Sequence, residues 1–469
     1  SEFDFKIYEL GIGLFGVKAI APEFNFLYGL NLGLLRGSSE NKYDGSENKY
    51  ESEMKEAPKP VTSIQVEDEE FELPEWELSH NYDYKKNPEE VMISEIMVVG
   101  TEIKHAISNL KKWTKPQKTS NPLSMMTVSS YVLHEPKGVC LLISPWNYPF
   151  SLTLKPLISA IAAGNTAMIK PSEMVFHTSA FITKMMNELF DKKEVAVFEG
   201  DYTVSTNLLK LPFDHIFFTG SPAVGKIVMR AAAENLSSVT LELGGKSPTI
   251  IDETAKLKTS AERIAWAKFL NNGQTCIAPD YLFVHESVKD EFLKEFQACV
   301  QKMYNKEGKG IQKSPSYCRI VNQKHFQRVK KLLDQAKASG AKIEFGGETN
   351  TDENFIAPTV LTAVNEEMEI MKEEIFAPLL PVITYKDQKE VIESIQRREK
   401  PLALYIYSSS KQNIDFFIKN TSAGGTVVND SLIQFGHPNL PFGGVNNSGI
   451  GKSGGEYGFI EFSNPRGII

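Results

Sequence analysis

Hydrophobic and polar positions divide the beginning of the chain into segments of different character. Residues 1–36 are apolar and rich in glycine, whereas residues 37 to about 80 are rich in Ser, Glu and Lys and contain SENKY twice, from positions 39 and 46. The polar segment cannot bury enough apolar surface to offset the entropy lost on ordering. We therefore expect residues 1–82 to form an atypical, partly disordered N-terminal extension.

A helical pattern begins at residue 87. Asn87 fits the N-cap position and Pro88 the first helical position. Apolar residues then recur at helical spacing, at Ile93, Ile96, Ile103, Ile107 and Leu110. The pattern predicts an amphipathic helix.

Short apolar runs alternate with helical stretches between residues of about 130 and 255. GVCLLIS, LTLKPLISAIAAG, TAMIKP and TSAFITKMMNELF follow one another along the chain. This rhythm is typical of a parallel sheet with crossover helices, so we expect a doubly wound α/β domain. A second α/β region follows, with helices near 260–272 and 286–303 and a strand at TVVND.

Composition and charge exclude several classes of protein. The 469 residues suffice for two or three domains, and the net charge of −8 argues against a surface that binds nucleic acid. The four cysteines contain no CxxC pair and the eight histidines no HExxH, so we expect neither a disulfide framework nor a metal site. The longest apolar stretch is interrupted by Glu9, Lys18, Pro22 and Glu23, and nothing resembles a signal peptide. We expect a cytoplasmic protein without a membrane span.

Two strand ends offer places for a phosphate-bearing cofactor. A strand at Ile216–Thr219 leads into a turn with Gly220, Ser221 and Gly225, and the helix that follows directs N–H groups toward any ligand there. The pattern is GSxxxG and not GxGxxG, so a simple strand-to-helix turn fits equally well.

Lys170 and Glu173 follow another strand, in MIKPSE. Ligands of open parallel sheets bind beyond the carboxyl ends of the strands, where these side chains would meet a ribose. A solvated turn is the alternative interpretation.

Two polar residues are candidates for chemistry. Glu242, in TLELGGKSP, has apolar neighbours that would raise its pKa toward neutrality, as a general base requires. A strand-end glutamate paired with a lysine is the more common arrangement. Asn147, in ISPWNYPF, has a side-chain amide that can donate a hydrogen bond to a developing oxyanion. The alternative interpretation is that this amide forms an Asx turn before Pro149.

Cys276 follows a helical pattern that Gly273 would end. A thiol on a loop after a glycine can be exposed and reactive, whereas Cys140 and Cys299 lie in apolar patterns typical of a core. Cys318 is ambiguous. Most single cysteines are inert, so Cys276 alone does not establish a nucleophile.

Taken together, the motifs resemble the aldehyde dehydrogenase superfamily. SPWNYPF, AAGNTAMIKPSE, FFTGSPAVGKIVM, TLELGGKSP, NNGQTCIAPDY, EEIFAP and LPFGG occur in that family's order and approximate spacing, across roughly residues 83–469. EIKHAISNLKKWTKP and GQTCIAPDY are most similar to the class 3, or fatty aldehyde dehydrogenase, branch.

The resemblance implies roles for individual residues. Cys276 would be the nucleophile, Glu242 the base that activates water, and Asn147 the donor to the oxyanion, together with the Cys276 backbone N–H. The implied cofactor contacts are Lys170 and Glu173 at the adenosine ribose, Gly220, Ser221 and Gly225 at the pyrophosphate, and Glu374 and Phe376 at the nicotinamide ribose and ring.

The implied reaction is NAD(P)-dependent oxidation of an aliphatic or aromatic aldehyde to its acid, through a cysteine thiohemiacetal and a thioester. The cofactor is NAD, with NADP also admitted. The resemblance implies a Rossmann-type NAD(P)-binding domain over residues 83–241, with an oligomerisation segment near 117–137. It further implies a catalytic domain over 242–425, a C-terminal segment over 426–469 that completes the cofactor domain, and a homodimer.

Three features depart from the family pattern. The glycine of EEIFGP is Ala377 here, and we expect the added methyl group to weaken cofactor binding modestly. The C-terminal region lacks a histidine often found there and the hydrophobic tail of membrane-anchored members, so we expect a soluble protein. Residues 1–80 lack the pattern of the paired amphipathic helices that precede EIKHA in this branch.

Two other functions fit the sequence. The altered N-terminal region fits a catalytically impaired scaffold that keeps the fold, but the set of Cys276, Glu242 and Asn147 argues against it. A CoA-acylating enzyme would pass the thioester to a thiol, whereas Glu242 favours hydrolysis.

Overall fold

The computed structural model describes residues 75–469. The apolar start, both copies of SENKY and most of the expected N-terminal extension lie outside the described residues. The last part of that expected extension is helical, because α3 spans Glu75–Tyr84 and packs along α7 (Phe176–Leu189).

The helix predicted from residue 87 is confirmed. The side chain of Asn87 accepts a hydrogen bond from the Glu89 N–H, and α4 (Pro88–Val91) begins with the predicted proline. The helix continues through a π-helical turn, η1 (Met92–Ile96), into α5 (Met97–Trp113).

The π-helical turn changes which residues of this helix face the core. A π-helical turn contains one residue more than an α-helical turn. Apolar residues before and after it therefore do not lie on one face at the usual α-helical spacing. Val91, Ile96, Ile103 and Leu110 are buried, but Ile93 is 59% exposed. The predicted apolar stripe is therefore wrong at Ile93.

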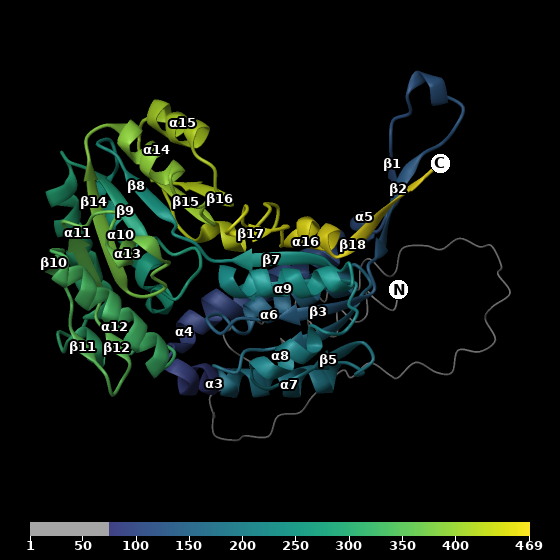
Figure 1. Ribbon diagram of the computed structural model, residues 1–469, viewed down its shortest axis with the longest axis horizontal. Helices are drawn as coiled ribbons and strands as arrows, with labels where there is room; N and C mark the ends of the chain where they lie inside the picture. Colours follow the sequence, from purple (N-terminus) through teal and green to yellow (C-terminus); the bar gives the residue numbers. More distant parts are fainter. Residues whose placement is uncertain (1–74) are drawn as a thin grey trace, which may run out of the picture. The chain divides into compact units, whose positions relative to one another are not determined.

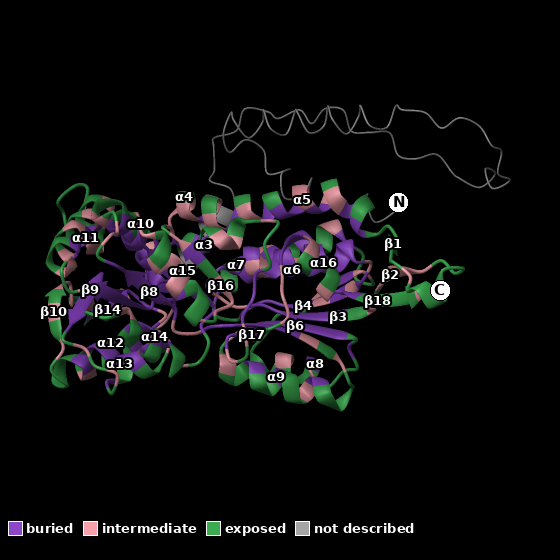
Figure 2. Cartoon of the chain, turned by 90° about the horizontal axis from the view of Figure 1, so that it is seen from above, coloured by how far each residue is buried: buried purple, intermediate pink, exposed green. Residues whose placement is uncertain are grey.

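The first α/β region forms a six-stranded sheet in the order β17-β7-β6-β3-β4-β5. All neighbours run parallel except β17, which is antiparallel to β7. Helices α8 and α9 cover one face, and α5, α6, α7 and α16 lie on the other (Figures 1 and 2), which confirms the doubly wound arrangement. The strands are β3 (Val139–Ile143), β4 (Thr166–Lys170), β5 (Val195–Val197), β6 (His215–Gly220), β7 (Ser238–Leu243) and β17 (Gly449–Ile450), and the further helices are α6 (Ser151–Ala162), α8 (Tyr202–Leu208), α9 (Pro222–Glu234) and α16 (Gly455–Glu461).

The second α/β region forms a seven-stranded sheet in the order β10-β13-β14-β9-β8-β15-β16, in which only β10 is antiparallel. Its strands are β8 (Pro248–Ile251), β9 (Tyr281–His285), β10 (Lys342–Phe345), β13 (Thr359–Thr362), β14 (Leu379–Tyr385), β15 (Ala403–Tyr407) and β16 (Gly425–Val428). Its helices are α10 (Leu257–Phe269), α11 (Lys289–Tyr304), α12 (Gln323–Ala338), α13 (Glu369–Lys372), α14 (Gln388–Gln396) and α15 (Lys411–Asn420). β11 (Thr349–Asn350) and β12 (Phe355–Ile356) form a separate small hairpin.

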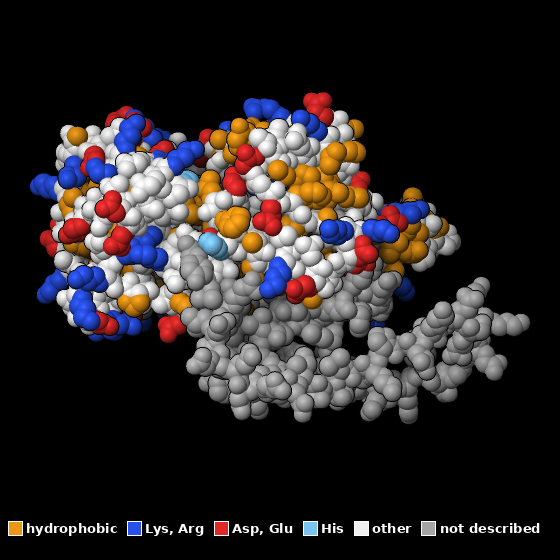
Figure 3. Space-filling model, turned by 90° about the horizontal axis from the view of Figure 1, so that it is seen from below, with side chains coloured by type: hydrophobic (Ala, Val, Ile, Leu, Met, Phe, Trp, Pro, Cys, Tyr) orange, Lys and Arg blue, Asp and Glu red, His pale blue; other side chains and the backbone are white. Residues whose placement is uncertain are grey.

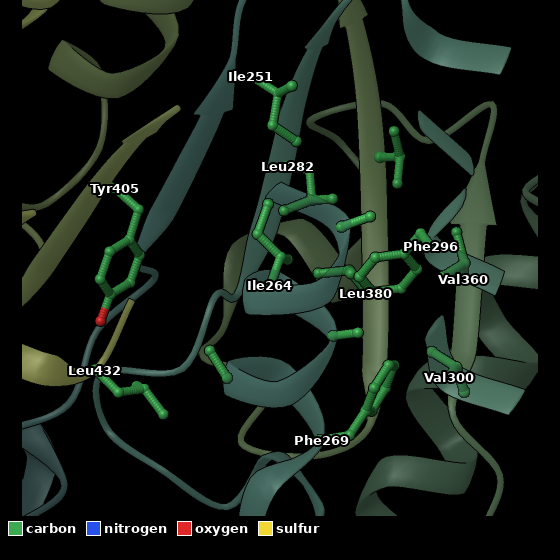
Figure 4. Packing of buried hydrophobic residues seen from close by; sticks show 14 of the residues in the cluster. Ile251, Ile264, Phe269, Leu282, Phe296, Val300, Val360, Leu380, Tyr405 and Leu432 are labelled. Carbon is green, nitrogen blue, oxygen red and sulfur yellow. The ribbon is translucent and has the colours of Figure 1, made fainter. Parts of the chain in front are cut away.

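Both faces of the second sheet are buried. Ile264 and Phe269 of α10 and Phe296 of α11 pack against Leu282 and Leu380 of the central strands (Figure 4). A second cluster joins α12, α14 and α15 to the other face. Because helices cover both faces, the strands are continuously apolar instead of alternating.

A three-stranded antiparallel sheet stands apart from the other two. β1 (Gln117–Lys118) pairs with β2 (Tyr131–Pro136), and β2 pairs with β18 (Ser463–Ile468). The connection between β1 and β2 exposes Leu123 at 86% and Met126 at 71% of their surface. The segment expected to mediate oligomerisation thus forms an arm that leaves apolar side chains uncovered.

Apolar side chains are also visible elsewhere on the surface. Figure 3 shows patches of them among basic and acidic groups on one face. Phe176 at the start of α7 and Tyr202 at the start of α8 are 66% and 72% exposed. None of the described helices is long and apolar enough to cross a membrane.

Candidate active site

Asn147 lies in the loop between β3 and α6, at the carboxyl end of the first sheet. Its side chain is 3% exposed and its Nδ2 donates to the Gln274 carbonyl over 2.9 Å, across to the loop that carries Cys276. Its own carbonyl accepts bonds from the Tyr84 hydroxyl at 2.9 Å and the Asn271 amide at 2.7 Å. The amide therefore joins two segments that are far apart in sequence, instead of capping its own turn.

The Cys276 loop is an unusual backbone turn. α10 ends at Phe269, earlier than the predicted position before Gly273, and Asn271, Asn272 and Gly273 follow with φ of 51°, 58° and 72°. Asparagine and glycine tolerate this left-handed region better than other residues do. The sequence therefore turns sharply and brings Cys276 back toward Asn147.

Gln274 holds this turn in place. It is fully buried, and its Nε2 donates to the carbonyls of Asn271 and Arg319 while its Oε1 accepts the Val321 N–H at 3.0 Å. Gln274 was not among the predicted site residues, although its place in GQTC is the signal that could have identified it.

Cys276 itself is partly exposed and unpaired. Burial raises the pKa of its thiol, and the carboxyl groups of Glu374 and Glu242 raise it further. The neutral thiol is therefore favoured near neutral pH in the unliganded protein. The same electrostatic effects indicate that the three side chains lie near one another.

Glu242 is at the end of β7 and is 6% exposed. The Ser453 hydroxyl donates to its Oε1 at 2.6 Å, whereas its Oε2 is buried without a hydrogen-bond partner among the described residues. Burial raises the pKa of Glu242 to about 7, against the effects of the Ser453 hydrogen bond and of Lys155 and Lys452. The carboxyl group can thus release and accept a proton near neutral pH.

The candidate cofactor residues surround the carboxyl ends of β4 and β6. Lys170 is 2% exposed and its Nζ contacts Glu173 Oε2 at 2.6 Å. Ser221 caps α9, because its Oγ accepts the Val224 N–H at 3.4 Å. The other N–H groups at this helix start can bind an anion.

Close packing of α9 depends on Gly225. A Cβ atom at Gly225 would lie 2.7 Å from Leu243 Cδ2, so the helix approaches β7 only because glycine is present. Gly220, which precedes the cap, ends β6. A strand, a tight turn and a close-packed helix are the parts that a dinucleotide pyrophosphate site requires, and the residues fit such a cofactor.

Glu374 and Phe376 lie on the segment before β14. A Cβ atom at Gly244 would lie 2.1 Å from Glu374 Oε2, and burial followed by the charge of Asp280 raises the pKa of Glu374 to about 8. Phe376 has a φ of 49° and its ring meets Trp146 edge to face at 5.4 Å.

Buried contacts of Asp280 and Lys246, neither of which was predicted, hold this segment. Asp280 Oδ1 accepts the Ile375 N–H at 2.9 Å, and Lys246 Nζ, which contacts Asp280 Oδ2, donates to the Glu373 carbonyl at 2.8 Å. Ala377, which replaces the family glycine, is fully buried.

The predicted residues thus form two groups. Asn147 reaches the loop that carries Cys276, and the charges of Glu242 and Glu374 act on the Cys276 thiol. The second group, at the strand ends of the first sheet, comprises Lys170, Glu173, Ser221 and the glycines. Among the described residues, no cluster of His, Cys, Asp and Glu could hold a metal ion.

Comparisons with known proteins agree with this architecture. The aldehyde dehydrogenase family model matches residues 81–468. Putative aldehyde dehydrogenase AldX of Bacillus subtilis is 47% identical over 82% of this chain and 86% of its own length. Aldehyde dehydrogenase family 3 member A2 of Pongo abelii is 44% identical over 82% of this chain and 78% of its own length.

Solved structures match as well. The substrate-bound state of Staphylococcus aureus AldH has a TM-score of 0.80 at 46% identity and covers 83% of this chain and 84% of its own. A Bacillus cereus aldehyde dehydrogenase solved as its NAD+ complex has a TM-score of 0.76 at 28% identity, over 84% of this chain and 79% of its own.

A Mus musculus relative, 40% identical over 82% of this chain and 83% of its own length, is named aldehyde dehydrogenase, dimeric NADP-preferring. The chain belongs to the aldehyde dehydrogenase family, in its class 3 branch, and is an NAD(P)-dependent enzyme that oxidises aldehydes.

Proposed function

We propose that this enzyme converts aliphatic or aromatic aldehydes to carboxylic acids by covalent catalysis at Cys276. The observation that carries the proposal is the 2.9 Å hydrogen bond from the Asn147 amide to the Gln274 carbonyl, two residues before the thiol. It holds a donor for the developing oxyanion beside the candidate nucleophile.

In the first stage, the Cys276 sulfur attacks the aldehyde carbon and loses its proton, and the carbonyl oxygen gains negative charge. Asn147 Nδ2 and the Cys276 backbone N–H donate to that oxygen. Because the thiol pKa is raised, it needs a nearby proton acceptor. Glu242 suits that task, because its pKa is about 7 and its buried Oε2 has no hydrogen-bond partner among the described residues.

Bound NAD or NADP would accept the hydride lost from the thiohemiacetal carbon, which would leave a thioester on Cys276. We assign the adenosine ribose to Lys170 and Glu173, the pyrophosphate to Gly220, Ser221 and Gly225, and the nicotinamide ribose and ring to Glu374 and Phe376. Glu173 would repel a ribose 2′-phosphate, and its carboxylate already pairs with Lys170. These contacts favour NAD, with NADP as the second cofactor.

Glu242 first releases the thiol proton to solvent. In the second stage it takes a proton from water, the hydroxide attacks the thioester carbon, and the Cys276 thiolate leaves and takes up that proton. The buried carboxyl group supports hydrolysis over transfer to coenzyme A, because its raised pKa makes it a base near neutral pH. Hydrolysis regenerates the thiol and releases the acid.

We further propose a cytosolic homodimer assembled through the arm of β1, β2 and β18. The exposed Leu123 and Met126 support the surface, and the dimeric mouse relative supports the stoichiometry. All four cysteines are free, as expected in a reducing compartment.

Formation of NADH from NAD and hexanal, followed by near-ultraviolet absorbance, tests the proposal. We expect NADH and hexanoic acid in equal amounts from the unaltered chain, with no dependence on coenzyme A. Cys276→Ala should abolish NADH formation and keep dinucleotide binding. Activity of Cys276→Ala, or hexanoyl-CoA as the main product, would contradict the proposal.

A further inference from the structure

Ionisable side chains that the proposed reaction does not use lie buried beside the Asn147 loop. Lys86 and Glu95 are 0% exposed, with Lys86 Nζ 3.0 Å from Glu95 Oε1, and His80 Nε2 lies 2.9 Å from the same oxygen. Removing such charges from water costs as much as their attraction returns, so a buried ion pair contributes little net stability. A role other than stability would account for it.

Glu95 reaches the helix that follows the Asn147 loop. Its Oε2 accepts the N–H groups of Phe150 at 2.8 Å and Ser151 at 3.3 Å. These begin α6, which has no side-chain N-cap of its own. Burial raises the pKa of Glu95, but Lys86 and His80 outweigh it and hold the value at about 2. A permanent negative charge therefore caps this helix from another segment.

Lys86 and Tyr84 hold the other side of the same loop. Lys86 Nζ lies 4.1 Å from the centre of the Tyr148 ring, and the Tyr148 hydroxyl pairs with Thr275 Oγ1 at 2.8 Å, next to Cys276. The Tyr84 hydroxyl donates to the Asn147 carbonyl. Segment 84–95 thus contacts the loop at residue 147, at residue 148 and at the start of α6.

We propose that Tyr84, Lys86 and Glu95 are positioning residues, which fix the Asn147 amide against the Cys276 turn so that it can bind the oxyanion. The inference rests on the proposed role of Asn147. None of the three needs to touch the substrate, because they act through the backbone on either side of Asn147. A displacement of about 1 Å at such a donor is enough to cost up to about 100-fold in rate.

A double-mutant cycle on the full chain tests this coupling. The readout is the single-turnover rate of NADH formation from hexanal, with the dissociation constant for NAD and the melting temperature measured beside it. Lys86→Met/Glu95→Gln removes both charges of the pair at once, and we expect a loss of about 10-fold or more with unchanged NAD affinity. In an Asn147→Ala background the same change should cost almost nothing, because the donor being positioned is gone.

Tyr84→Phe is the milder variant, and it decides the question if the pair variant does not fold. It removes one hydroxyl, so we expect a loss of about 2- to 10-fold that also vanishes in the Asn147→Ala background. The matched control is Asp252→Asn, because Asp252 is likewise fully buried and accepts a backbone N–H, from Thr254 at 2.8 Å, but does so at the end of β8. Its effect should be the same in both backgrounds.

The outcomes separate the two proposals. If the unaltered chain forms no NADH, the proposed function fails and takes this inference with it. Suppose instead that the unaltered chain is active, but Tyr84→Phe and the pair variant lower the single-turnover rate by the same factor in the unaltered and the Asn147→Ala backgrounds. Their role is then only structural, and this inference alone is overturned. Losses that disappear in Asn147→Ala support it.

Discussion

Cys276 is held in surroundings that disfavour the thiolate needed for attack. Burial is the first cause, and the nearby carboxyl groups of Glu374 and Glu242 add to it. A thiol of this kind resists alkylation and oxidation, because the thiolate is the reactive form. The raised pKa therefore predicts slow alkylation of the proposed nucleophile in the unliganded enzyme near neutral pH.

The carboxyl groups make a testable contribution to this raised pKa. Glu374 has a pKa of about 8, so it is ionised in the pH range where the thiol begins to titrate. Glu374→Gln removes that charge, and alkylation of Cys276 by iodoacetamide, read by mass spectrometry at a series of pH values, should accelerate at lower pH than in the unaltered enzyme. Glu373→Gln changes the neighbouring carboxylate, which faces solvent beside Arg328, and should leave the profile in place. An unshifted profile in Glu374→Gln would contradict the electrostatic argument.

The residues of the site were predictable where they sit in contiguous motifs. Asn147 follows a strand, Cys276 follows a helix and Glu242 lies at the end of a strand, so contiguous motifs located all three. Ser453 and Glu95 were not predictable. Each contacts the site from a segment more than 50 residues away in sequence, and no local motif contains either of them. Their partners are set by tertiary packing.

At the scale of elements, α9 shows how one small residue sets a helix on a sheet. The helix starts at a serine cap and lies close to β7 only because Gly225 has no side chain. The sequence predicted the strand, turn and helix, whereas their close approach became evident only from the fold.

Replacing Gly225 should therefore separate the two elements. We expect Gly225→Ala to lower the free energy of unfolding by about 1–2 kcal/mol, because the new methyl group overlaps Leu243, and to weaken NAD binding at the helix start. Chemical denaturation and a binding titration measure the two effects. Gly436→Ala is the control, since a Cβ there meets no atom within 4 Å. Equal stability of both variants would mean that α9 shifts without cost.

The helix from residue 87 contains a feature that its residue pattern did not predict. Its cap and most of its apolar positions were predicted, but the π-helical turn, within which Ile93 is exposed, was not. That turn buries Glu95, a carboxylate that a surface helix would expose. The irregular turn and the capping of α6 by Glu95 are thus one arrangement.

At the scale of the whole molecule, the arm of β1, β2 and β18 is the proposed contact between copies. Light scattering after size exclusion should give the mass of two 52.5 kDa chains. Leu123→Glu combined with Met126→Glu should shift the mass toward one chain, because charges replace the uncovered apolar groups. Leu236→Glu, at a residue that is 94% exposed on the turn after α9, should leave the mass unchanged. A single-chain mass for the unaltered protein would contradict the proposed dimer.

The first sheet is assembled from two distant parts of the chain. β17 and α16 join it only after the whole second sheet, and β18 pairs with a strand more than 300 residues earlier. A ribosome that has made residues 83–425 has therefore produced every proposed catalytic and cofactor-binding side chain, yet neither the outer strand of the cofactor sheet nor Ser453. We expect the edge of β7 to stay unpaired during synthesis until β17 is made, and an unpaired strand edge is a site where nascent chains can associate. We therefore expect enzymatic competence only after residues 426–469, which supply β17 and Ser453, have been made.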